Sequence, residues 1–212
     1  MADIFPASSE KDSIRIFESD FLEFFTHIHP AVIVVIWLPV GLYFLLSAIA
    51  SVQVGVPVAA VPLGLLIGIF LWSFIEYTLH RFLFHFTPRN PTQERLAFLF
   101  HGVHHLRPQD KTRLVMPPIV SVPLALLFYG LMHLVVVSLL GTPGWLDPIF
   151  AGFVFGYLTY DLTHYATHHF PMRAPVLRYL KRYHMMHHYK TPDARFGVSS
   201  PLWDIVFGTK PD

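Results

Sequence analysis

Cysteine is absent from this 212-residue chain, and charged residues are scarce, at 14% of the total. The lack of cysteine excludes disulfides, thiolate-ligated haem, iron–sulfur clusters and cysteine-based zinc sites. The low charge accompanies a hydrophobic content of 53%, including 20 phenylalanines. Such a composition leaves too little polar surface for a soluble domain of this length. It therefore indicates an integral membrane protein.

The sequence also lacks a dense basic segment and an apolar signal-peptide core. The net charge is +1 and no dense run of Lys or Arg occurs, so we expect no binding to nucleic acid. The first residues, MADIFPASSEKDSIRIF, contain acids and no continuous apolar core, unlike a signal peptide. We expect residues 1–30 to form an interfacial segment that leads into the membrane domain.

Four apolar stretches are predicted to cross the membrane as helices. The first, 31–50, contains twenty uncharged residues, and the second, 58–79, follows after a short loop. The third, 114–140, opens with a proline-rich stretch, and the fourth, 145–163, has the shortest apolar run. The sequence therefore predicts an all-α integral membrane protein with four transmembrane helices in a single domain, 31–212.

Positive charge falls on one side of this predicted arrangement. The loops 51–57 and 141–147 contain no Lys or Arg, whereas all fifteen cations lie in the N-terminal segment, in 80–113 or in 164–212. By the positive-inside rule, the side with the cations is cytoplasmic. We therefore expect 80–113 and 164–212 to form a cytoplasmic helical cap, with both termini on the same side.

Eleven of the fourteen histidines occur in four short motifs of the predicted cap. The motifs are HRFLFH (80–85), HGVHH (101–105), HYATHH (164–169) and HMMHH (184–188). Residues three and four apart share a helix face, so HxxHH presents three imidazoles to one side. His169 points about 100° away from His168 on a helix, and we expect it to stand apart from the ligands. His80 and His85 lie about 140° apart on an ideal helix, so either the helix unwinds between them or each serves a different metal.

Ten imidazoles remain without His169, which suits two metal ions with about five ligands each. Imidazole binds iron, zinc, copper and nickel. A structural zinc ion needs four ligands and has no redox chemistry, whereas a pair of irons can activate dioxygen. Metal binding requires neutral imidazole, and the cations beside HMMHH are expected to disfavour protonation.

The other polar residues near the predicted membrane boundary have simpler interpretations. Glu76 and Asp161 precede two of the motifs, and each is a candidate to accept the second N–H of a ligating histidine. His169 is a third candidate for such an outer position. His27, His29 and His133 lie outside the motifs and are interpreted as structural or surface residues.

The order HxxxxH, HxxHH, HxxxHH, HxxHH on a four-span protein resembles the fatty acid hydroxylase/sterol desaturase superfamily. The stretches LWSFIEYTLHRFLFH, HGVHHLRPQDKTRLVMPP and FGVSSPLWDIVFGT resemble the fatty acid 2-hydroxylases in particular, and the similarity covers roughly residues 65–210. In that family ten histidines bind two metal ions. Iron is the working metal, and zinc can occupy the same site in a purified sample. Carried over to this sequence, the ligands are His80, His85, His101, His104, His105, His164, His168, His184, His187 and His188.

The resemblance implies a membrane-bound di-iron monooxygenase that uses dioxygen to hydroxylate a long-chain fatty acyl lipid at C2. Eukaryotic members often carry a fused cytochrome-b5-type domain, whereas only about thirty residues precede the first predicted span here. Two electrons are therefore expected from a separate donor, a cytochrome-b5-type protein or a ferredoxin with its reductase.

Two alternatives stay open at this point. One is another oxidation of the superfamily, namely sterol or carotenoid hydroxylation or lipid desaturation, which ligand counting does not separate from 2-hydroxylation. The other is a metal-ion transporter. A transporter would place polar ligands within the spans near the midplane, whereas here only His133 lies inside a predicted span and the motifs crowd one side.

Overall fold

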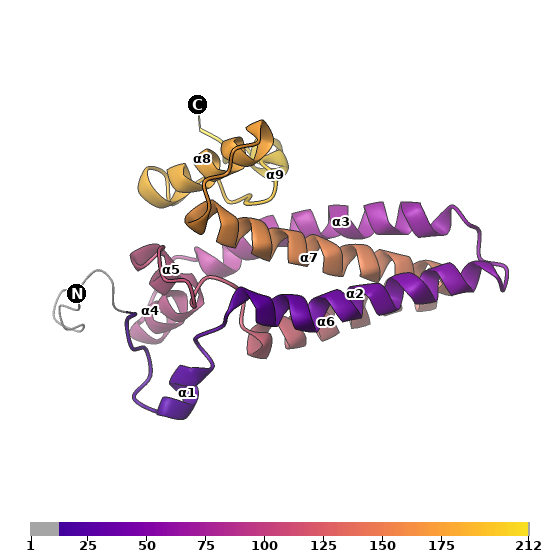
Figure 1. Cartoon of the computed structure of the whole chain (residues 1–212), viewed down its shortest axis with the longest axis horizontal. Helices are drawn as coiled ribbons and strands as arrows, with labels where there is room; N and C mark the ends of the chain where they lie inside the picture. The colour runs from indigo at the N-terminus through magenta and orange to yellow at the C-terminus, as the bar shows by residue number, and fades with distance from the viewer. Residues whose placement is uncertain (1–12, 212) are drawn as a thin grey trace.

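The computed structural model describes residues 13–211, which form helices and no strands. The long helices of the described chain run side by side and make up a stem (Figure 1). They are α2 (Pro30–Val52), α3 (Ala60–Thr78), α6 (Pro118–His133) and α7 (Leu146–His169). Shorter helices gather at one end of the stem as a cap. They are α1 (Asp20–Phe24), α4 (Pro91–Ala97), α5 (Val103–Leu106), α8 (Pro175–Tyr189) and α9 (Leu202–Val206).

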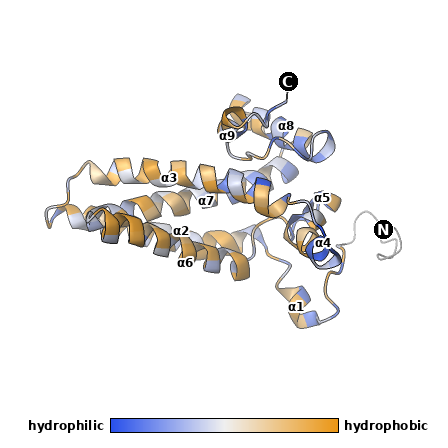
Figure 2. Cartoon of the chain, turned by 180° about the vertical axis from the view of Figure 1, so that it is seen from behind, coloured by the Kyte–Doolittle hydropathy of each residue, from blue (hydrophilic) through white to orange (hydrophobic). Residues whose placement is uncertain are grey.

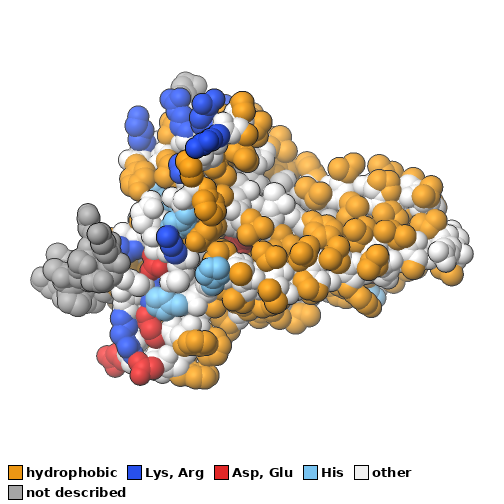
Figure 3. Space-filling model, viewed as in Figure 1, with side chains coloured by type: hydrophobic (Ala, Val, Ile, Leu, Met, Phe, Trp, Pro, Cys, Tyr) orange, Lys and Arg blue, Asp and Glu red, His pale blue; other side chains and the backbone are white. Residues whose placement is uncertain are grey.

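Among residues 13–211, three helical segments are long and apolar enough to cross a membrane. They are Pro30–Val52, Ala60–Phe84 and Pro118–Leu139, and they coincide with the first three predicted spans. The second continues past α3 through the π-helix η1 (Leu79–Phe84), and the third ends in the π-helix η3 (Leu134–Leu139). The stem is predominantly hydrophobic along its length, whereas Lys, Arg, Asp and Glu gather at the cap (Figures 2 and 3). These features describe a multi-pass membrane protein.

The fourth predicted span, 145–163, lies within α7 but is less apolar than the other three. α7 has 24 residues, and most of them are buried. It lies between α2 and α3 in the stem (Figure 1) and packs most extensively against these two helices. A helix enclosed by other helices needs no lipid-facing apolar surface on every side, which explains its lower hydropathy.

Glycines allow α3 and α7 to approach each other closely. α3 carries Gly64 and Gly68, and α7 carries Gly152 and Gly156, so each helix has two glycines four residues apart. A Cβ atom on Gly68 would lie 2.0 Å from a backbone oxygen of α7, and one on Gly152 would lie 2.2 Å from a backbone oxygen of α3. Small residues at this spacing let membrane helices pack backbone to backbone. The close pairing sets the position of η1, which continues α3 and carries His80, relative to the end of α7 that carries His164 and His168.

The N-terminal segment is attached to the loop before α6. The Arg113 guanidinium, whose side chain is 3% exposed, pairs with Glu23 and also contacts His27. Phe21 and Phe24 of the short helix α1 remain exposed on the outside of the cap. An interfacial helix was expected in this region, and residues 1–12 of the expected segment lie outside the described residues.

Candidate metal centre

Ten histidines lie together in two groups within the cap. Within each group, one ring nitrogen of every histidine lies within 4.8 Å of the others. The first group consists of His80, His85, His101, His105 and His187. The second group consists of His104, His164, His168, His184 and His188. All ten are the residues selected from their spacing in the sequence, and residues as distant along the chain as His80 and His187 meet here, with ring centroids 4.7 Å apart.

A π-helix brings the first two histidines of the first group together. η1 continues α3, and the His85 N–H donates to the His80 carbonyl oxygen at 3.1 Å. This bond between residues five apart places the two rings beside each other, with centroids 5.0 Å apart. Single π-turns of this kind are found mostly at functional sites. The spacing of His80 and His85 left two possibilities, a helix that unwinds between them or a different metal for each. The structure has the first, and both histidines belong to one group.

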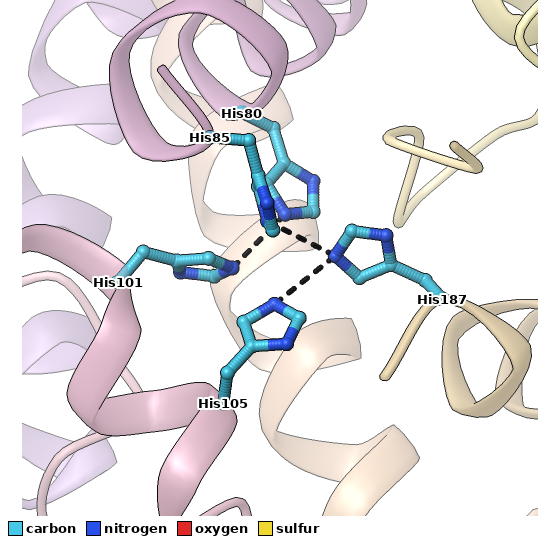
Figure 4. A group of neighbouring side chains, drawn as sticks. All are labelled: His80, His85, His101, His105 and His187. Atoms are coloured by element: carbon cyan, nitrogen blue, oxygen red, sulfur yellow. Dashed lines mark hydrogen bonds between the residues drawn. The ribbon is translucent and has the colours of Figure 1, made fainter. Parts of the chain in front are cut away.

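The ring nitrogens of the first group point at a common centre (Figure 4). His80 Nε2 lies 3.0 Å from His101 Nε2, and His187 Nε2 lies 3.1 Å from the Nε2 atoms of His85 and His105. Two imidazole nitrogens bound to one ion at about 2.1 Å and at a right angle would lie about 3.0 Å apart. The observed spacing therefore fits five imidazoles around one metal ion.

The second group has the same spacing. His104 Nε2 lies 3.1 Å from the Nε2 atoms of His164 and His188. His184 Nε2 lies 2.9 Å from His168 Nε2 and 3.0 Å from His188 Nε2. Four of the five rings come from α7 and α8, where each helix supplies two histidines one turn apart. This group also fits one metal ion.

Each HxxHH motif divides its histidines between the two groups. His101 and His105, four apart, belong to the first group, whereas His104 belongs to the second. In HMMHH the pair four apart belongs to the second group and His187 joins the first. The groups meet where the rings of His105 and His188 stack, with centroids 4.2 Å apart. The motifs therefore present their imidazoles across two adjacent metal positions.

Hydrogen bonds to the C-terminal tail (residues 190–211) determine which ring nitrogen of two histidines is protonated and which can bind a metal ion. His80 Nδ1 lies 2.5 Å from the Phe196 carbonyl oxygen, and His187 Nδ1 lies 2.7 Å from the Ala194 carbonyl oxygen. A carbonyl oxygen only accepts, so in both rings Nδ1 carries the proton and donates it. The Nε2 atoms of the neutral rings therefore present lone pairs to the centre of the first group. This donor set is suited to a metal ion.

Burial keeps the imidazoles of the two groups neutral. Burial, with a smaller effect of neighbouring histidines, lowers the pKa of His105 and of His188 to about 2. The same causes lower the pKa of His85 to about 3 and that of His184 well below its usual value. Because metal ions bind the unprotonated ring, both groups can ligate at neutral pH. The cations beside HMMHH were expected to have this effect, but burial and the other imidazoles are its main causes.

Glu76 and Asp161 have partners other than the expected histidine N–H groups. Glu76 Oε1 accepts the backbone N–H groups of Val198 at 2.7 Å and Ser199 at 2.8 Å. The Asp161 carboxylate accepts the N–H of Met116 at 3.2 and 3.3 Å. Within residues 13–211 no hydrogen bond joins either carboxylate to a histidine. Glu76 instead fixes the C-terminal tail, whose carbonyl groups orient the histidines.

The four remaining histidines lie outside both groups. The ring of His169 packs against that of Tyr165, with centroids 4.5 Å apart. His29 accepts an N–H in the first turn of α2 and caps that helix. His27 contacts Arg113 near the N-terminal segment, and His133 is exposed at the end of α6. These positions agree with the structural interpretation of His27, His29 and His133.

Two residues that orient histidines of the first group could not be identified from the sequence. Ala194 and Phe196 act through backbone carbonyl oxygens, which every residue type possesses. The Phe196 ring also packs against His80, His85 and His187, with centroids 5.8, 5.6 and 5.9 Å away. The only available pointer was the stretch FGVSSPLWDIVFGT, which carries the family resemblance without containing any histidine.

The fold and the two histidine groups define an all-helical, multi-pass membrane protein with a histidine-rich site suited to two metal ions. Residues 65–209, more than half of the chain, match the fatty acid hydroxylase family. The chain belongs to this family of oxidoreductases.

Relatives with described activities agree with this assignment. A dihydroceramide fatty acyl 2-hydroxylase of Arabidopsis thaliana is 43% identical over 199 residues, which cover 93% of this chain and 80% of the relative. The fatty acid 2-hydroxylase of Homo sapiens is 35% identical over 92% of this chain and 56% of its own length. A solved structure of full-length scs7p, in which only the hydroxylase domain is visible, superposes with a TM-score of 0.81 at 41% identity. That match covers 91% of this chain and 70% of the solved one.

Proposed function

We propose that this chain is a di-iron monooxygenase that hydroxylates a long-chain fatty acyl group at C2. The observation that carries the proposal is the convergence of ten imidazoles in two groups of five, with neighbouring Nε2 atoms 2.9–3.1 Å apart. The first group would hold one ion and the second group the other. All ten histidines are the metal ligands that we propose.

Iron is the metal that suits the reaction. Zinc is redox-inactive, whereas two irons supply the activation of dioxygen that hydroxylation of an unactivated C–H bond requires. The chain itself keeps the imidazoles neutral through burial and holds the Nε2 lone pairs of His80 and His187 toward one centre. Its further task is to present C2 of the acyl chain to that site. Zinc in a purified sample would be compatible with the same ligands.

The proposed topology has four crossings and a cytoplasmic cap. α7 has 24 residues, which corresponds to about 36 Å of helix and exceeds the roughly 30 Å of a hydrocarbon core. It runs along the stem beside the three apolar spans (Figure 1), so we include it as the fourth transmembrane helix. The cations then place the cap, the metal site and both termini on the cytoplasmic side. Residues 31–212 form one domain in this scheme, and residues 1–30 an interfacial segment.

The substrate that we propose is a long-chain acyl lipid. The Arabidopsis relative is named for dihydroceramide fatty acyl 2-hydroxylation and the human one for fatty acid 2-hydroxylation. Both names share a long acyl chain and position C2, so these are the features that we transfer to the present chain. An acyl chain in the bilayer would reach the cap from the end of the stem.

The decisive experiment supplies iron-loaded membranes with a reductant, a long-chain acyl substrate and ¹⁸O-labelled dioxygen. We expect a 2-hydroxy product that carries one labelled oxygen atom, identified by lipid mass spectrometry. Membranes that contain His187→Ala serve as the control for background activity. Label at another carbon would indicate a different hydroxylase, and an unlabelled double bond would indicate a desaturase. Metal uptake into vesicles without any oxidised lipid would favour transport.

The electron donor that we propose is a separate acidic protein, of the cytochrome-b5 type or a ferredoxin with its reductase, and it docks on α8. This helix carries three of the ten histidines. The adjoining surface exposes four cations, namely Arg173, Arg178, Arg182 and Lys190. Lys and Arg also gather on the outer part of the cap in the space-filling view (Figure 3). Complementary charge guides such encounters and makes them sensitive to salt.

Reversal of charge on α8 tests this docking surface. We expect the double substitution Arg178→Glu, Arg182→Glu to raise the KM for the donor protein by about tenfold and to weaken its salt dependence. The rate with dithionite, a small reductant, should stay unchanged because the metal site is intact. Arg95→Glu on α4 is the matched control, since Arg95 is an exposed cation elsewhere on the cap. An equal effect of both replacements would contradict docking at α8.

A further inference from the structure

Arg195 separates the two residues whose carbonyl groups hold His80 and His187. Its φ is 62°, and it is the only residue other than glycine with a positive φ among residues 13–211. Side chains with a Cβ disfavour this left-handed conformation. The backbone angles at Arg195 determine where the Phe196 carbonyl lies once the Ala194 carbonyl is fixed. Both hydrogen bonds to the first group therefore depend on this conformation.

The end of the chain holds Arg195 in place. The Arg195 N–H donates to the Thr209 carbonyl oxygen at 2.9 Å, and Nη2 donates to the Pro211 carbonyl oxygen at 2.9 Å. The guanidinium lies over the ring of Tyr183 on α8, 5.2 Å from its centroid. The residue is only 4% exposed. These contacts offset the unfavourable backbone conformation.

Asp204 joins two segments of the tail, one at Phe196 and Gly197 and the other at Thr209. Its carboxylate accepts the N–H groups of Phe196 at 2.8 Å and Gly197 at 2.7 Å. It also accepts the hydroxyl of Thr209 at 2.7 Å. Asp204 is completely buried. The tail therefore acts as one unit that carries the Phe196 carbonyl to His80.

In the part of the tail that the structure describes, no residue makes an equivalent hydrogen bond to the second group. Its rings come from α5, α7 and α8. Within residues 13–211, the Nδ1 atoms of four of its members have no hydrogen-bond partner, namely those of His164, His168, His184 and His188. The tail therefore orients ligands of the first group, whereas the ligands of the second group are oriented by the helices that carry them.

We infer that Arg195 is a positioning residue whose left-handed backbone makes metal binding by the first group, and not by the second, depend on the C-terminal tail. The inference rests on the metal centre of the proposed function and extends it to the residues that orient its ligands. Outer partners that fix a ligating histidine change metal affinity by roughly 10–100-fold. Loss of the left-handed conformation at Arg195 should therefore lower the affinity of the first group for its metal ion by about that factor.

The test compares substitutions that differ in their tolerance of a positive φ. The full chain is purified in detergent, and bound iron per chain is titrated without oxygen for Arg195→Gly, Arg195→Ala and Arg195→Val. All three remove the guanidinium, but glycine tolerates the left-handed conformation and valine tolerates it least. We expect Arg195→Gly to bind both ions, and Arg195→Val to bind one of them about 10–100-fold more weakly. Arg195→Ala should lie between the two.

Gly141→Val is the matched control for backbone strain. Gly141 has a φ of 64°, and nothing lies within 4 Å of the position of a Cβ atom there. It follows the third apolar span, in the loop at the end of the stem away from the cap. We expect this variant to bind both ions like the unaltered chain. Helical content and thermal unfolding, followed by circular dichroism, show whether each variant is folded.

Several results would overturn the inference. Unchanged affinity for both ions in Arg195→Val would show that the conformation is not needed. An equal loss of affinity for both ions would show that the tail only supports the overall fold. If Arg195→Val does not fold, the comparison of Arg195→Gly with Arg195→Ala takes its place. Equal iron affinities of these two variants would also show that the left-handed conformation is not needed. An unaltered chain that binds two irons without forming a 2-hydroxy product would contradict the proposed function and not this inference.

Discussion

Replacement of His187 by alanine is expected to abolish the proposed 2-hydroxylation and to prevent binding of one of the two proposed metal ions. His187 is completely buried, and its Nε2 lies 3.1 Å from the Nε2 atoms of both His85 and His105. Alanine offers no lone pair, and the other four members of the first group lie outside α8, so that helix supplies no replacement ligand. Turnover should fall by more than the roughly 100-fold that follows loss of an outer partner of a ligand. The measurements are iron per chain and labelled product per iron.

Two other histidines provide controls for His187→Ala. His133 is exposed at the end of α6, away from the cap, and His169 lies one residue from a proposed ligand but outside both groups. We expect His133→Ala and His169→Ala to retain both ions and most of the activity. Loss of iron in all three variants to the same extent would refute the assignment of ligands.

The second large effect is expected from Gly68→Ala, which should prevent α3 and α7 from packing together. The added Cβ would lie 2.0 Å from the carbonyl oxygen of Ile149 and 2.5 Å from the backbone nitrogen of Phe153. Backbone atoms cannot move aside like the end of a flexible side chain, so the helices must separate. We expect the free energy of unfolding to fall by about 3 kcal/mol or more. Thermal unfolding in detergent and the yield of monodisperse protein measure the effect.

Gly130→Ala is the matched control for Gly68→Ala. Gly130 also lies inside a membrane helix, α6, but nothing lies within 4 Å of the position of its Cβ. Alanine favours helix over glycine by up to about 1 kcal/mol, so the variant should be as stable as the parent or slightly more stable. A similar loss of stability in both variants would contradict close packing of α3 on α7 as the cause.

Close packing of these helices also matters for the metal site. α3 leads into η1 with His80, and α7 ends with His164 and His168. A shift of one helix against the other moves ligands of the first group relative to ligands of the second. The variant Gly68→Ala should therefore bind iron less tightly even where part of the protein remains folded.

The membrane class and the selection of the ten histidines depended on local features that the sequence displays directly. Uninterrupted apolar runs indicate spans because the bilayer core accepts little else, and three of these runs are the apolar helices of the structure. The histidine motifs stand out because imidazoles at these spacings are rare without a metal to bind. The pairs of glycines in α3 and α7 were equally visible and could have indicated their close contact.

Other features depend on contacts between distant segments, which spacing does not reveal. His80 and His85 allowed two arrangements, and the π-helix η1 decided between them. The splitting of each HxxHH motif follows from how the two motifs pack against each other, with the rings of His105 and His188 stacked, rather than from the spacing of either motif. The role of Glu76 was mistaken because a carboxylate near a histidine in sequence is not necessarily its partner in space.

The sequence by itself determined that this protein is a membrane-embedded member of a histidine-rich oxygenase family, because hydropathy and ligand spacing are properties of short segments. Only the tertiary structure decided which five histidines form each group and which carbonyl oxygens orient them. Those choices follow from the packing of α3 on α7 and from the fold of the C-terminal tail, where segments more than 100 residues apart come into contact. Backbone groups have no residue-type signature, so their part in the site appears only once the chain is folded.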